Sequence, residues 1–108
     1  MSEVRARVLV PPQVKRGEVF EVRVLIQHGM ETGYRRDLEG RRVTRNILHS
    51  LVCRYNGAEV FRATMSSGTA ANPYLRFFTR ATESGELAFW WIDDNDATGT
   101  ASAKVVVA

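Results

Sequence analysis

Apolar and polar residues alternate along most of the chain, and this period of two is the feature that most constrains the fold. In the segment EVFEVRVLI, apolar side chains Phe20, Val22, Val24 and Ile26 occupy every second position. Successive side chains of a strand point to opposite faces, so these four residues are expected to share one face. The segment therefore predicts a β-strand that is buried on that face.

Six further segments have strand-like patterns, and turn residues separate them at short intervals. The dipeptide Asn56-Gly57 is a strong hairpin signal, and Glu83-Ser84-Gly85-Glu86 is a second, less specific one. No segment shows a helical period. We therefore predict an all-β protein, a β-sandwich of about seven strands. The six segments are VRARVLV, NILHSLVCRYN, AEVFRATM, YLRFFTRAT, ELAFWWID and ASAKVVV.

Length and composition favour one soluble domain spanning residues 1–108. The chain is 44% hydrophobic and 25% charged, which is ordinary for a globular protein. No apolar run approaches the roughly 20 residues of a membrane helix. The N-terminal segment carries Glu3, Arg5 and Arg7 where a signal peptide is apolar, so we expect no targeting signal of its own. A net charge of +3 is too small to indicate a nucleic-acid-binding protein.

The stretch from His28 to Arg45 lacks a clean strand pattern and opens with HGMETGYRR. Long loops on a compact sandwich are often functional. Its charges have two interpretations: a solvated loop with internal compensation, or a surface that attracts an acidic partner or a small oxyanion. Five arginines bracket Asp37 and Glu39, namely Arg35, Arg36, Arg41, Arg42 and Arg45.

Metal and catalytic sites find little support. A blue-copper site needs two histidines, a cysteine and a weak axial methionine, yet no histidine follows Cys53. In WWIDDNDATG an EF-hand-like spacing begins at Asp94, but its twelfth position is Val105, where calcium binding requires glutamate. No serine lies in a recognisable nucleophile motif. We expect no catalytic residue, no metal site and no cofactor.

The single cysteine and the paired aromatic residues are the other candidate contact residues. Cys53 is expected to be a small buried side chain; alternatively it could form a disulfide with another chain. Because Phe77-Phe78 and Trp90-Trp91 are neighbouring pairs, one member of each is expected on an outer face. An exposed aromatic patch would mark an interface.

Taken together, four segments resemble the SoxZ family, the smaller subunit of the SoxYZ sulfur-carrier complex of bacterial sulfur oxidation. The resemblance extends from about Pro11 to Val107. The family more often has H-P-M-E-T-G-x-R where this chain has Gly29 instead of proline. The segments are HGMETGYRRDLEGR, NILHSLVCRYNGAEVFRA, ANPYLRFFTR and ESGELAFWWIDD.

The resemblance implies an immunoglobulin-like sandwich and a non-catalytic subunit that binds SoxY, whose C-terminal cysteine carries the sulfur. It implies transient contacts with the Sox enzymes that process this sulfur, and a periplasmic location reached in complex with a SoxY that has a signal peptide. This sequence ends in AKVVVA, without a Gly-Gly-Cys arm, so we expect it not to be the carrying subunit. The alternative is a generic immunoglobulin-like binding or adhesion module.

We expect HGMETGYRR to be a recognition loop, in which Met30 offers an adaptable apolar contact and the arginines offer forked donors. The exposed aromatics are the other candidate interface. The expected partner-binding residues are His28, Met30, Glu31, Arg35, Arg36, Tyr74 and Trp91; Cys53 is the residue that the alternative, an intermolecular disulfide, would use.

Overall fold

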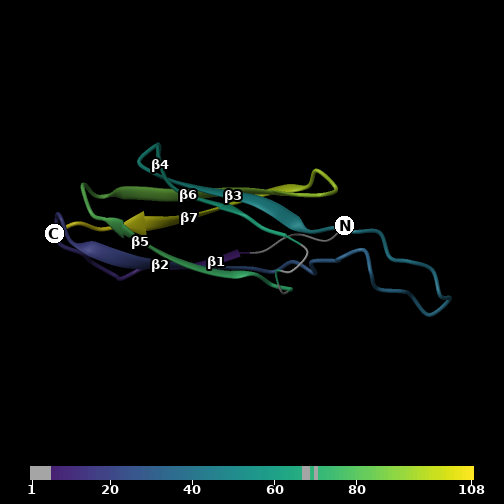
Figure 1. The fold of residues 1–108 in the computed structure, drawn as a ribbon. Coiled ribbons are helices and arrows are strands. Elements are labelled where there is room, and N and C mark those ends of the chain that lie inside the picture. Colours follow the sequence, from purple (N-terminus) through teal and green to yellow (C-terminus); the bar gives the residue numbers. More distant parts are fainter. Residues whose placement is uncertain (1–5, 67–68, 70) are drawn as a thin grey trace.

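The computed structural model describes residues 6–66, 69 and 71–108, and within these residues it contains seven strands and no helix (Figure 1). None of the described residues therefore forms a helix that could cross a membrane. The strands are β1 (Ala6–Leu9), β2 (Val19–Ile26), β3 (Leu48–Tyr55), β4 (Ala58–Thr64), β5 (Tyr74–Arg80), β6 (Gly85–Asp93) and β7 (Thr98–Val105).

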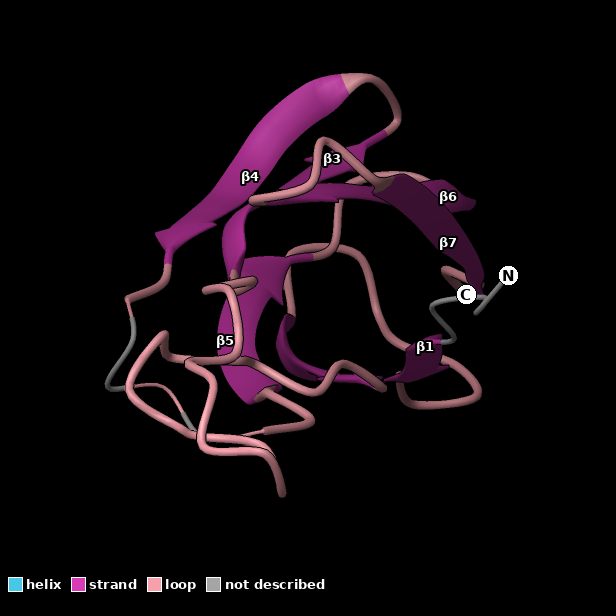
Figure 2. Ribbon diagram, turned by 90° about the vertical axis from the view of Figure 1, so that its right-hand side faces the viewer, coloured by secondary structure: helices cyan, strands magenta, loops and turns pink. Residues whose placement is uncertain are grey.

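Two antiparallel sheets face each other. One has the strand order β1-β2-β5 and the other the order β4-β3-β6-β7. Figure 2, a view along the strands, shows the two layers with the loops gathered at the near end. The predicted all-β sandwich of seven strands is confirmed, with the immunoglobulin-like architecture of two packed antiparallel sheets.

The core lies between the sheets and is built from the alternating apolar positions. Phe20, Val22, Val24 and Ile26 of β2 are all buried, which confirms the predicted buried face. Phe61 of β4 stacks on Phe77 of β5 with ring centroids 4.2 Å apart, and this contact joins the two sheets along one side. Burying a large apolar side chain stabilises a fold by about 1.5–3 kcal/mol, so this alternation supplies much of the driving force.

One predicted hairpin is present and the other is wrong. Asn56 and Gly57 have positive φ of 48° and 88°, as a two-residue type I′ turn requires, and they connect β3 to β4. The turn around Glu83-Ser84-Gly85 instead carries the chain from β5 in one sheet to β6 in the other. Turn chemistry marks where a strand ends, but it does not determine which sheet the next strand joins.

The segment between β2 and β3, residues 27–47, projects beyond the end of the sandwich (Figure 1). It makes the molecule elongated, with principal extents of 57 × 22 × 20 Å. We call residues 27–47 the arm.

Candidate functional site

The arm is a narrow antiparallel ribbon rather than an irregular loop. Glu31 and Asn46 exchange two backbone hydrogen bonds, each 2.8 Å long, and further out Arg36 pairs with Arg42. Gly33 has a φ of 90°, and a Cβ added there would lie 3.1 Å from the Cβ of Arg45. Glycine therefore suits both the backbone conformation and the close approach of the two runs at this point.

A buried hydrogen-bond network fixes the base of the arm. The Met30 N–H donates to Nδ1 of His28 at 3.0 Å, which leaves the ring proton on Nε2, 3.2 Å from Asp93 Oδ2. The other carboxylate oxygen of Asp93 accepts the N–H groups of Asn95 and Ala97 at 2.9 and 3.0 Å. His28 and Asp93 are 6% and 4% exposed. The network thus ties the arm to the turn between β6 and β7.

Met30 also belongs to this buried framework. It is only 5% exposed, and its Sδ accepts the Leu48 N–H at 3.2 Å. The prediction that His28 and Met30 form a contact surface is wrong, because both side chains point into the protein. The alternation of buried and exposed residues in β2 continues past Ile26 through His28 to Met30. Extending the period-two pattern four residues further would have placed them correctly.

The charged residues of HGMETGYRR do reach the surface, and they differ in their partners. Arg35 Nη2 binds Glu31 Oε1 at 2.6 Å; these hydrogen bonds lower the pKa of Glu31 and raise that of Arg35. Arg36 is exposed and donates only to the Gly40 carbonyl among the described residues, at 2.8 Å. Glu31 and Arg35 therefore hold each other, whereas the Arg36 charge faces solvent.

Arg45 and Asp94 form an ion pair that links the arm to the β6–β7 turn. The Arg45 Nε lies 2.8 Å from Asp94 Oδ2, which also accepts the Ile47 N–H at 3.2 Å. Partial desolvation acts to raise the pKa of Asp94, but the Ile47 and Arg45 hydrogen bonds outweigh it and the pKa is lowered. The carboxylate form is therefore favoured where the arm leaves the sandwich.

A second surface covers the outside of the three-stranded sheet. We call its outward-pointing residues the outer sheet face. Tyr74 and Phe78 are 54% and 59% exposed, and Phe78 lies opposite Glu21 in the β2–β5 ladder. Aromatic and arginine residues are enriched at the centres of protein interfaces. The apolar members of the outer sheet face are Leu9, Val19, Leu25, Tyr74 and Phe78; its arginines are Arg7, Arg23, Arg76 and Arg80.

The paired aromatics divide between core and surface as predicted, but they do not form one patch. Phe77 and Trp91 are buried, while Phe78 and Trp90 are exposed. Because β5 and β6 belong to different sheets, Phe78 and Trp90 lie on opposite sides of the molecule. Trp91, 1% exposed, is a core residue, so its prediction as a contact residue is wrong. Tyr74 is on the surface.

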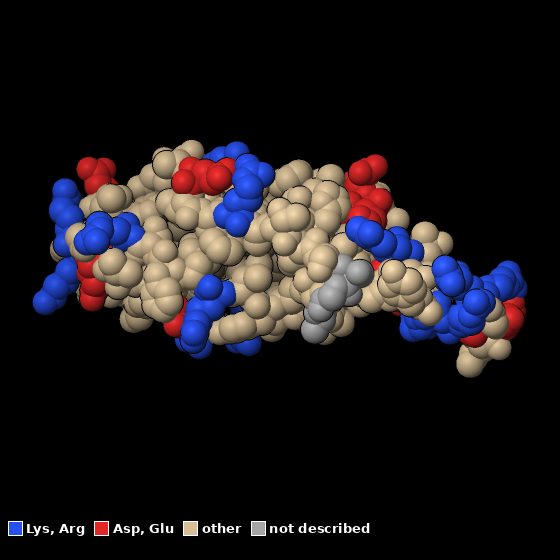
Figure 3. Space-filling model, in the orientation of Figure 1, with Lys and Arg blue, Asp and Glu red and all other residues tan. Residues whose placement is uncertain are grey.

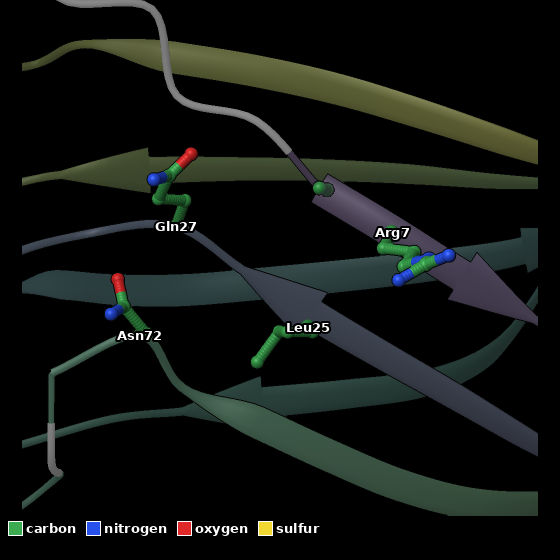
Figure 4. A pocket seen from close by; sticks show the side chains of 5 residues that line it. Arg7, Leu25, Gln27 and Asn72 are labelled. Carbon is green, nitrogen blue, oxygen red and sulfur yellow. The ribbon is translucent and has the colours of Figure 1, made fainter.

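An open hollow of about 270 Å³ adjoins the outer sheet face. Figure 4 shows Arg7 and Leu25 on the neighbouring strands β1 and β2, with Gln27 and Asn72 beside them where β2 ends and before β5 begins. The Asn72 Oδ1 accepts the His28 N–H at 2.9 Å. The hollow therefore lies between the outer sheet face and the base of the arm.

Cys53, the single cysteine, is fully buried in β3. Burial raises the pKa of its thiol to about 12. A disulfide with another chain, the alternative that the sequence left open, would require β3 to open. The raised pKa also means that Cys53 stabilises the fold below the unfolded thiol pKa of about 8.5, and that this contribution is lost as the pH rises towards 12.

We therefore expect Cys53 in the native protein to react with a thiol reagent at pH 8 more than about a hundredfold slower than in unfolded protein, because thiolate and access are both scarce. The measurement is 5,5′-dithiobis(2-nitrobenzoate) labelling with and without guanidinium, and Cys53→Ser gives the blank. Rapid native labelling, or a dimer sensitive to dithiothreitol, would contradict this assignment.

No group of three or more histidine, cysteine, aspartate or glutamate side chains that could hold a metal ion occurs in residues 6–66, 69 and 71–108. The outer sheet face and the exposed part of the arm carry exposed aromatic, apolar and arginine side chains, which suit macromolecular contacts.

Comparisons with known proteins identify the family and the fold of the chain. Residues 7–104 match the family model of the sulphur oxidation protein SoxZ. No curated protein matches. Among solved structures, a superoxide reductase (neelaredoxin) from Ignicoccus hospitalis has a TM-score of 0.74 at 18% identity, covering 95% of this chain and 79% of that one. The sulfur carrier protein SoxY from Chlorobium limicola f thiosulfatophilum has a TM-score of 0.67 at 11% identity, covering 94% and 74%.

At these identities the two structures share a fold with this chain and nothing more can be taken from them. The family model is different in kind, since it covers nearly all of the described strands. The chain belongs to the SoxZ family of sulfur-oxidation proteins.

Proposed function

We propose that this chain is the non-catalytic subunit of a SoxYZ-type sulfur carrier, and that it binds and supports SoxY while SoxY carries the sulfur intermediates of thiosulfate oxidation. The observation that carries the proposal is the match to the SoxZ family over residues 7–104. The buried state of the only thiol, Cys53, supports a subunit that does not itself carry sulfur. We propose a periplasmic location, reached together with SoxY.

The outer sheet face is the surface that we assign to SoxY. It holds Tyr74 and Phe78 on one strand, with Leu25 opposite Tyr74 on the next. Four arginines and one carboxylate, Glu21, are interspersed with these apolar side chains, and Glu21 pairs with Arg23 at 3.1 Å and with Arg76 at 3.8 Å. Exposed aromatic and apolar side chains together with arginines are typical of protein interfaces, and the excess of arginines over Glu21 favours a SoxY surface that carries carboxylates.

The first test is co-expression with the cognate SoxY, followed by native mass spectrometry under reducing conditions. We expect a stoichiometric complex that forms without a disulfide. Phe78→Ala is expected to weaken this complex about tenfold or more, because a central interface aromatic is a typical hot spot. Trp90→Ala, which removes an exposed aromatic from the opposite sheet, is the matched control and should leave the affinity within about twofold.

Each outcome has a separate meaning. A monomer indifferent to SoxY would contradict the proposed function and leave a generic immunoglobulin-like binding module. A complex that tolerates Phe78→Ala but not Trp90→Ala would keep the function and move the SoxY surface to the four-stranded sheet.

A further inference from the structure

The outer end of the arm presents apolar residues far from any core. Leu38 is fully exposed and Tyr34 is 77% exposed, and both lie on the ribbon that projects beyond the sandwich (Figure 1). We call Tyr34, Arg36, Leu38 and Arg42 the arm tip. Single exposed apolar residues are common on protein surfaces, so Leu38 alone does not indicate a docking site. The charges beside it are the second observation.

Two arginines of the arm tip have no counter-ion among the residues that the structure describes. Arg36 and Arg42 are opposite each other in the ribbon, and like charges directly opposite on paired strands are destabilising. Within the described residues neither arginine forms an ion pair. Figure 3 shows the cations gathered at this projecting end.

The other three arginines of the arm are compensated. They pair with carboxylates as Arg35–Glu31, Arg41–Glu39 and Arg45–Asp94. Among the arginines of the arm, those without an ion pair in the described residues are therefore the two of the arm tip, which flank the turn that holds Asp37 and Leu38.

The turn that holds the arm tip is well ordered by its own hydrogen bonds. Asp37 Oδ1 accepts the N–H groups of Glu39 and Arg41, both at 2.9 Å. Backbone bonds of 2.8 Å from Asp37 to Arg41 and from Val43 to Arg35 continue the ribbon. A pre-organised element loses little conformational entropy on binding, so these hydrogen bonds favour a rigid docking element.

We propose that the arm tip docks a second protein partner, distinct from SoxY, whose surface offers an apolar pocket for Leu38 rimmed by carboxylates that pair with Arg36 and Arg42. This partner is an enzyme that acts on the sulfur carried by SoxY, a choice that rests on the proposed function. The arm extends past the end of the sandwich, whereas the outer sheet face lies along its side. Both surfaces can therefore be occupied together.

Charge chemistry favours a protein over a nucleic acid at this position. Asp37, which has no ion pair among the described residues, lies in the same turn as Leu38 and would repel a phosphate backbone. Isolated carboxylates on a protein rim can pair with Arg36 and Arg42 individually, and such rim charges act mainly on the association rate.

The experiment uses the intact SoxYZ complex and each purified Sox enzyme that oxidises or hydrolyses the sulfur on SoxY. Affinity and rates are measured by biolayer interferometry at two salt concentrations. For at least one enzyme, the double variant Arg36→Glu/Arg42→Glu should bind about tenfold more weakly, because association becomes slower. The association rate of this variant should also lose most of its dependence on salt concentration. Leu38→Ser should bind about tenfold more weakly through faster dissociation.

The matched control is Arg16→Glu, a charge reversal at an exposed arginine in the segment before β2, at the other end of the sandwich. It should stay within twofold of the wild type, and every variant should bind SoxY normally. Variants that bind all the enzymes within twofold would overturn the proposal. So would arm-tip variants that release SoxY, because the tip would then belong to the SoxY interface. A wild-type chain that never binds SoxY would instead overturn the proposed function, and with it this choice of partner.

Discussion

Met30→Ala is expected to lower the free energy of unfolding by about 2–5 kcal/mol, although Met30 lies in the segment that the sequence indicated as a recognition loop. The side chain is 5% exposed and packs in the core. Truncation would leave a cavity and would remove the Sδ acceptor of the Leu48 N–H. Urea unfolding followed by tryptophan fluorescence measures the change.

Leu38→Ala is the matched control for Met30→Ala. It also shortens an apolar side chain of the arm, but Leu38 is fully exposed, so stability should change by less than about 0.5 kcal/mol. If Met30→Ala were as stable as the wild type and bound SoxY or a Sox enzyme less tightly, Met30 would be a contact residue after all.

Asp93→Ala should destabilise the protein by about 3 kcal/mol, because it removes one member of a buried polar network. Three donors would lose their acceptor: His28 Nε2–H and the backbone N–H groups of Asn95 and Ala97. Urea unfolding gives the loss of stability. Amide hydrogen exchange at Asn95 and Ala97 should become faster, because their hydrogen bonds disappear.

Asp96→Asn is the control for this variant. It removes a carboxylate from the same turn, but Asp96 is exposed, and asparagine tolerates its positive φ of 61°. We expect a change below about 0.5 kcal/mol. If Asp93→Ala cost no more than this control, the network would not hold the base of the arm.

Met30→Ala and Asp93→Ala, compared with the arm-tip variants, separate the framework of the arm from its surface. Met30, His28 and Asp93 determine where the ribbon leaves the sandwich, and their loss should affect stability first. Arg36, Leu38 and Arg42 lie on the outside, so their replacement should change binding while the fold stays intact. A variant that affects both would indicate that the ribbon transmits changes at its tip to the sandwich.

Only part of the candidate site was accessible from sequence. Arg35, Arg36 and Tyr74 were placed on the surface correctly, since charged and amphipathic side chains favour solvent. Leu38 was not chosen as a contact residue, because an apolar residue in a loop has no pattern that reveals its exposure, and Arg42 was recognised only as one member of the arginine cluster. Their importance emerged only from the pairing of Arg36 with Arg42 across the ribbon.

The sequence by itself determined the strand class, the buried face of β2, the Asn56-Gly57 hairpin and the outward position of one aromatic in each pair. These features depend on neighbours within a few residues, where the alternation of side chains is enough. Only the tertiary structure decided that β5 and β6 join different sheets, so that Phe78 and Trp90 occupy opposite surfaces. Sheet membership depends on pairing with strands distant in sequence, and local alternation is the same whichever strand becomes the neighbour.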